Sequence, residues 1–176
     1  KAFLHFCQGE LDQAKTAIQD VDRYLELHPE ILGTVYALPI YSRVCLALGD
    51  VQQALRANQQ LLDYLDKASF SFLRADTYYF KGRALLALDQ VEDALTALTE
   101  ARQIAERTQV HRILWEILAV SAEGQARLGD EEMAEGLRLQ AHDMVDRIAS
   151  HLDDSDLREG FLANASLGIQ GGVTTA

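Results

Sequence analysis

Hydrophobic residues recur along this chain at the spacing of an α-helix. Near the beginning of the sequence an apolar side chain returns every three or four residues, which places these side chains on one helical face. The positions are Leu11, Ala14, Ile18, Val21 and Leu25. They predict a helix over residues 10–28, which ends there because the residue before Pro29 is pushed out of the helical region.

One segment of the pattern repeats every 40 residues. Leu46-Ala47-Leu48-Gly49-Asp50-Val51 returns at residues 86–91, and in both places an alanine follows three residues later. Shorter copies stand at Gly9-Glu10 and Gly129-Asp130, so four copies share one register. The pattern predicts three helix pairs, over residues 32–48 and 51–67, 71–88 and 91–108, and 110–128 and 131–151.

The residues at each copy suit a tight turn between two helices. Glycine at position 49 supplies the left-handed conformation that ends a helix, and Asp50 can cap the next helix with its carboxylate. Asp89 replaces the glycine in the third copy, where aspartate tolerates this conformation better than most residues. Small residues also recur on both sides of the turn, where we expect the paired helices to approach closely: Ala2, Ser42, Gly82 and Ala122 before it, and Ala14, Ala54, Ala94 and Ala134 after it.

This arrangement resembles the tetratricopeptide repeat (TPR), over residues 1–152. The resemblance implies an all-α fold, a right-handed α-solenoid of antiparallel helix pairs. The repeat of 40 residues exceeds the usual length of about 34, and it looks like the longer repeats of large bacterial signal-transduction ATPases and maltose-type transcription activators. The first turn follows only eight residues, so we expect a first repeat truncated at its N-terminus.

The last part of the chain is expected to close the repeats. Residues 153–156 offer capping side chains for a short helix over 153–167, in which Leu157, Phe161 and Leu162 would cover the last helix pair. Residues 168–176 show no helical pattern and are predicted to form a flexible tail.

Composition and charge limit the kinds of partner that the chain can bind. With 48% hydrophobic and 24% charged residues the chain is typical of a globular protein. Its formal net charge of −11 argues against direct binding of nucleic acid or of an anionic membrane. The two cysteines, Cys7 and Cys45, and the lack of a signal peptide favour a cytoplasmic protein without a disulfide.

The sequence offers no catalytic pattern. The five histidines are scattered without a metal-ligand spacing, and no glycine-rich loop stands between a strand and a helix. We therefore expect a binding protein, not an enzyme, with no cofactor and no metal.

The resemblance places a binding groove on the first helix of each pair. The residues expected to line it are Tyr36, Ile40, Arg43, Asp76, Tyr79, Phe80, Arg83, Glu116 and Glu123. Arg43 and Arg83 occupy the same place in adjacent repeats, where two guanidinium groups could hold a carboxylate of a peptide. In the alternative reading they only pair with Asp76, Glu116 or Glu123 on neighbouring helices.

Three functions remain open at this point. The first is an interaction module of a larger regulatory protein, which binds a peptide or protein segment in the groove. The second is a domain that senses a small-molecule inducer for an attached ATPase or transcription regulator. The third is a self-association module, in which repeat ends stack to form a homodimer.

Overall fold

The chain folds entirely into helices within the part that the structure describes. The structure is a computed structural model, and it describes residues 4–5, 8–27, 32–68 and 73–171. In these ranges there are eight α-helices, one short 3-10 helix and no strand, which confirms the all-α prediction. The helices are α2 (Leu11–Leu27), α3 (Leu32–Ala47), α4 (Val51–Ala68), α5 (Arg74–Ala87), α6 (Val91–Thr108), η1 (His111–Ile113), α7 (Leu114–Arg127), α8 (Glu131–Ala149) and α9 (Ser155–Gly171).

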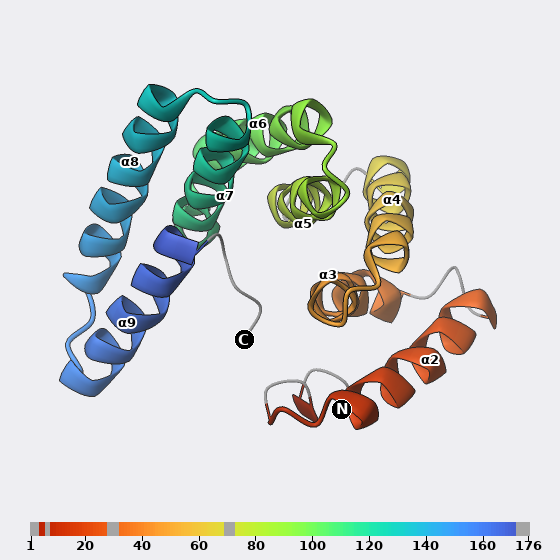
Figure 1. The fold of residues 1–176 in the computed structure, drawn as a ribbon. Coiled ribbons are helices and arrows are strands. Elements are labelled where there is room, and N and C mark those ends of the chain that lie inside the picture. Colours follow the sequence, from red (N-terminus) through yellow and green to blue (C-terminus); the bar gives the residue numbers. More distant parts are fainter. Residues whose placement is uncertain (1–3, 6–7, 28–31, 69–72, 172–176) are drawn as a thin grey trace.

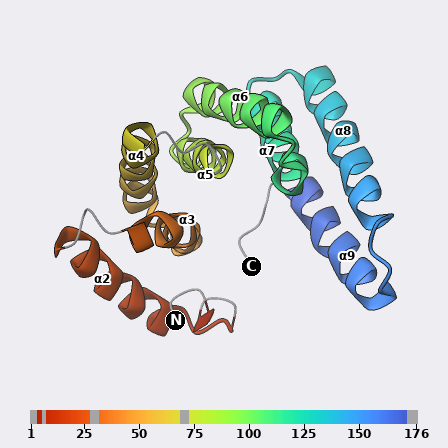
Figure 2. The same cartoon turned by 180° about the vertical axis from the view of Figure 1, so that it is seen from behind.

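Helices that are joined by a predicted turn pack against each other. The closest partners are α3 with α4, α5 with α6, and α7 with α8. The helices α3, α5 and α7 also contact one another in sequence, from α3 to α5 and from α5 to α7. Figures 1 and 2 show a curved row in which α3, α5 and α7 lie on the inner side and α4, α6 and α8 on the outer side.

The turns have the predicted geometry. Gly9, Gly49 and Gly129 have φ values of 75°, 78° and 84°, and Asp89 adopts the same left-handed conformation with φ 59°. The carboxylates that follow the glycines cap the next helix: Asp50 accepts a hydrogen bond from the amide of residue 53 at 3.3 Å, and Asp130 accepts one from that of residue 133 at 3.0 Å. These interactions are local, which is why the sequence identifies them.

Small residues bring the paired helices close together, as expected. Of the small residues before the turns, Ser42 and Ala122 are buried, and Gly82 lies against Leu98 of α6. A Cβ atom on Gly82 would stand 2.6 Å from the Cγ atom of Leu98. The four alanines after the turns are fully buried.

The C-terminal helix is longer than the sequence suggested. Helix α9 extends to Gly171, so the prediction of an unstructured tail is wrong for residues 168–171, while residues 172–176 lie outside the described part. Ala165 and Ile169 stand one turn apart and are buried in the core, and this packing outweighs the weak helical propensity of the segment. Phe161 packs on Trp115 as expected, but Leu157 is 65% exposed and does not cover the last pair.

The remaining differences are small. Helix α5 begins at Arg74, whereas a start at residue 71 was expected; residues 69–72 lie outside the described part. A 3-10 turn precedes α7, where an α-helix was expected from residue 110.

Cys45 is buried in α3, whereas Cys7 lies outside the described residues. Within the described ranges, no helix has the length and apolar character needed to cross a membrane.

Candidate functional site

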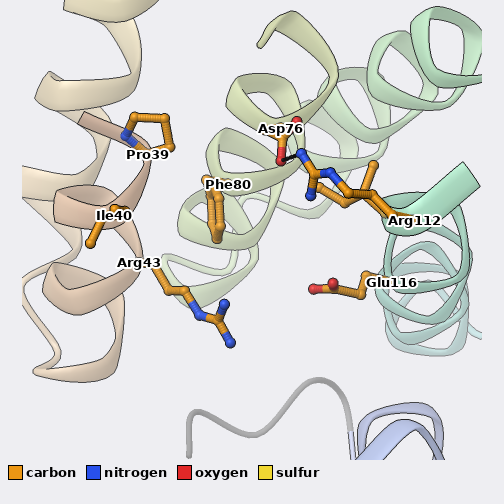
Figure 3. Close-up of a pocket in the computed structure, with 8 residues that line it drawn as sticks. Pro39, Ile40, Arg43, Asp76, Phe80, Arg112 and Glu116 are labelled. Atoms are coloured by element: carbon orange, nitrogen blue, oxygen red, sulfur yellow. Dashed lines mark hydrogen bonds and ion pairs between the residues drawn. The ribbon is translucent and has the colours of Figure 1, made fainter. Parts of the chain in front are cut away.

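A pocket opens on the inner side of the row, where α3, α5 and η1 with α7 face one another. Its volume is about 170 Å³. It is lined by Pro39, Ile40, Arg43, Asp76, Phe80, Arg112, Ile113 and Glu116 (Figure 3). The pocket thus combines four apolar or aromatic side chains with four charged side chains.

Helical spacing explains why these side chains meet. Ile40 and Arg43 on α3 are three residues apart, Asp76 and Phe80 on α5 are four apart, and Arg112 lies four before Glu116. Residues at these separations share one face of a helix. Since α3, α5 and α7 lie next to one another, the three faces form one surface.

The first ion pair of the pocket joins α5 to η1. Arg112 Nη2 donates a hydrogen bond of 2.6 Å to Asp76 Oδ1, and the Asp76 side chain is only 8% exposed whereas that of Arg112 is 63% exposed. The second carboxylate oxygen of Asp76 is buried and has no hydrogen bond within the described residues. Arg112 therefore holds a buried carboxylate from the open side of the pocket.

The second polar contact joins α5 to α7. The hydroxyl group of Tyr79, a fully buried residue, donates a hydrogen bond of 2.9 Å to Glu116 Oε2. Burial raises the pKa of Glu116 above its ordinary value, against the lowering effects of this hydrogen bond and of Arg43, Arg83 and Arg112. Burial and the nearby charge of Glu116 raise the pKa of Tyr79 well above its ordinary value. Tyr79 thus stays neutral and remains a hydrogen-bond donor to Glu116.

Three arginines surround Glu116. Arg43 reaches from α3 toward Glu116 across the pocket (Figure 3), and Arg83 places its Cζ atom 5.8 Å from the centroid of the Tyr79 ring. Arg43, Arg83 and Arg112 contribute three positive charges here, and Asp76 and Glu116 contribute two negative charges. The charged side chains that line the pocket therefore balance, two arginines against two carboxylates, and Arg83 beside the pocket adds one positive charge.

The structure brings most of the predicted groove residues together. Ile40, Arg43, Asp76, Phe80 and Glu116 line the pocket, and Arg83 lies beside it on Tyr79.

Two predicted groove residues, Tyr79 and Glu123, do not line the pocket. Tyr79 is fully buried, so the expectation that it faces the groove is wrong, and it supports Glu116 from within the core. Glu123 does not line the pocket but bonds to Arg127 on its own helix. The side chain of Tyr36 lies outside the described part.

Sequence reasoning missed Arg112 and Ile113. The spacing of four residues between Arg112 and Glu116 was the available signal, because it places both side chains on one helical face. The alternative reading of Arg43 and Arg83 also describes part of the arrangement, since both act on the charge of Glu116. A carboxylate of the protein thus lies within electrostatic range of both arginines.

Nothing in this arrangement is typical of a metal centre. Within the described ranges, no group of three or more His, Cys, Asp or Glu side chains could hold a metal ion.

Comparisons of the chain with protein-family models, curated proteins and solved structures give no match.

Proposed function

We propose that this chain is a non-catalytic interaction module that binds a peptide or protein segment on the inner surface of α3, α5 and α7. An anionic group of the segment enters the pocket and bonds to Arg43 and Arg83. The observation that carries this proposal is that Arg43, Arg83 and Arg112, from three helical segments, all act on Glu116 at one pocket of a chain whose net charge is −11.

The chemistry of the pocket suits a carboxylate next to an apolar group. A guanidinium group offers a planar fork of donors that matches a carboxylate. Phe80 and Pro39 provide apolar walls, and Ile40 is 49% exposed at the rim although it is a large apolar residue. Exposed apolar surface beside directed polar groups is the usual composition of a binding site.

The proposal includes the architecture that the sequence suggested. In this view the helix pairs are antiparallel and form a right-handed TPR-like solenoid that belongs to a larger regulatory protein. The 40-residue register and the left-handed residues at positions 9, 49, 89 and 129 support this view. A solenoid of this kind offers an extended inner surface on which a segment of chain can lie.

The test is a double substitution of Arg43 and Arg83 by alanine. Binding is measured by fluorescence anisotropy against a library of short peptides that each carry one carboxylate beside an apolar residue. We expect the double variant to lose at least tenfold in affinity, since each charge-assisted hydrogen bond is worth about 1.5–3 kcal/mol. Unchanged affinity together with unchanged helicity, measured by circular dichroism, would remove Arg43 and Arg83 from the site.

A matched control uses two arginines of the outer helices. Arg102 on α6 bonds to Glu106 on the same helix, and Arg138 on α8 bonds to Glu135. Replacing both by alanine changes the net charge by the same amount as the test variant. Peptide affinity should stay within twofold of the unsubstituted protein, and an equal loss would mean that overall charge, not the pocket, controls binding.

The size of the pocket favours a second candidate, the sensing of a small-molecule inducer. Its volume of about 170 Å³ is below the roughly 300–1,000 Å³ of sites for drug-sized ligands, so a free ligand inside it would be a small metabolite. A thermal-shift screen against anionic metabolites separates the two candidates, because a ligand that binds only the folded state raises the unfolding midpoint. A free metabolite that binds more tightly than every peptide would replace the first candidate.

A further inference from the structure

We infer that Glu116 is a specificity-determining residue that competes with the ligand for Arg43 and Arg83, so that binding of an anionic group takes up a proton at Glu116. This inference rests on the proposed function, because it concerns the same pocket and the same anionic ligand. It adds an identified competitor within the protein and a dependence of affinity on pH.

The geometry keeps Glu116 in the pocket. Its carboxylate accepts the hydrogen bond of 2.9 Å from Tyr79, whose side chain is fully buried and cannot follow a large movement. Glu116 also lines the pocket that the ligand would enter. An incoming carboxylate therefore lies beside Glu116 and does not simply displace it.

Two carboxylates at one site disfavour each other's ionised forms. When like charges share a site, the pKa of one group rises and a proton is bound. The charged and titratable groups that act on Glu116 are Arg43 of α3, Tyr79 and Arg83 of α5, and Arg112 of η1. Of these arginines, Arg43 lines the pocket and Arg83 lies beside it on the Tyr79 ring, so Glu116 and a ligand in the pocket would share them.

Glu116 is suited to take up the proton. Burial already raises its pKa above the ordinary value for glutamate, and a second negative charge beside it raises that pKa further. A free carboxylate of a peptide has a lower pKa, about 3.3–3.7, and stays ionised. The proton that enters on binding therefore goes to Glu116 and not to the ligand.

The experiment uses N-acetyl-leucine as the probe, because it has one carboxylate and one apolar side chain, and its carboxamide as the uncharged control. Chemical shifts in the protein's NMR spectrum give the dissociation constant between about pH 5 and pH 8, where the probe remains ionised. We expect the dissociation constant of the unsubstituted protein to rise with pH, by about tenfold for each unit by which the bound probe raises the pKa of Glu116.

The variant Glu116→Gln keeps an oxygen that can accept the hydrogen bond from Tyr79 but has no charge and no proton to gain. It should bind the probe more tightly than the unsubstituted protein at about pH 8 and with no dependence on pH. The matched control is Glu106→Gln on α6, which removes an exposed carboxylate that is bonded within its own helix. This control should bind as the unsubstituted protein does.

The outcomes separate this inference from the proposed function. If the probe binds but its affinity is independent of pH, or if Glu116→Gln binds more weakly, the inference is overturned and the proposed pocket stands. If neither the probe nor any carboxylate peptide binds, while the control carboxamide behaves identically, the proposed function fails as well. The pH series of the unsubstituted protein decides the question even where a variant is poorly folded.

Discussion

The close contact between Gly82 and Leu98 allows a sharp prediction about stability. Replacing Gly82 by alanine adds a Cβ atom that would lie 2.6 Å from Cγ and 2.9 Å from Cδ2 of Leu98, and 3.2 Å from the carbonyl oxygen of Ala94. The first two distances are shorter than carbon atoms tolerate. Leu98 is fully buried, so its side chain cannot turn into solvent to make room.

The magnitude follows from two opposing effects. An extra methyl group in a packed core costs about 1–3 kcal/mol. Alanine in place of glycine within a helix stabilises the folded state by roughly 0.5–1 kcal/mol. We therefore expect Gly82→Ala to lower the free energy of unfolding by about 1–2 kcal/mol, measured from the midpoint of urea unfolding at an unchanged slope.

A second glycine provides the matched control. Gly136 lies inside α8, and a Cβ atom there would have no atom within 4 Å. Gly136→Ala should therefore raise the free energy of unfolding by roughly 0.5–1 kcal/mol. In a background with Leu98→Val, the cost of Gly82→Ala should shrink, because the two positions share one contact. Equal stabilisation by Gly82→Ala and Gly136→Ala would refute the reasoning from close packing.

Four further predictions follow from individual side chains. Asp130→Ala should lower the free energy of unfolding by about 1 kcal/mol, measured by urea unfolding, because the N-terminal cap of α8 is lost. Asp130→Asn should keep most of this stability, because asparagine can also cap the helix. Tyr79→Phe should cost about 1–3 kcal/mol at neutral pH, because Glu116 loses its hydrogen-bond donor, and less in acid. The pKa of Glu116 is higher in the folded state than in the unfolded state, so the free energy of unfolding should fall as pH rises from the unfolded-state pKa through the folded-state pKa. In Glu116→Gln, the urea midpoint should not show this fall. Ser42 and Asn58 stand one repeat, 40 residues, before Gly82 and Leu98, and among the described residues their buried side-chain atoms have no hydrogen-bond partner. Ser42→Gly with Asn58→Leu should therefore raise the thermal midpoint, and a lower midpoint would contradict this.

Local features of the fold could be predicted well from the sequence. The turn at Gly49 and its equivalents depends on left-handed residues and on a cap three residues away, and both are visible in a short stretch of sequence. Most predicted helix boundaries lie within a few residues of the observed ones for the same reason. Where a boundary was wrong, as at the end of α9, burial of Ile169 by distant parts of the chain was responsible.

The candidate site could be predicted only in part. The 40-residue register showed that Arg43 and Arg83 are equivalent, and helical spacing showed which residues share their face. It could not show that Arg112 bonds to Asp76, which lies 36 residues earlier, because the angle between neighbouring helices sets that contact. It also could not distinguish Tyr79, which is buried, from Phe80, which lines the pocket.

The sequence by itself determined the repeating unit of this protein: two helices, a left-handed turn, and small residues that let the helices approach. These features arise from backbone conformation and from contacts between near neighbours in the chain, so they are encoded locally. Only the tertiary structure decided which charges meet, because α3, α5 and α7 must first lie side by side before Arg43, Asp76 and Glu116 can share a pocket. The burial that raises the pKa of Glu116 likewise exists only after the helices have packed.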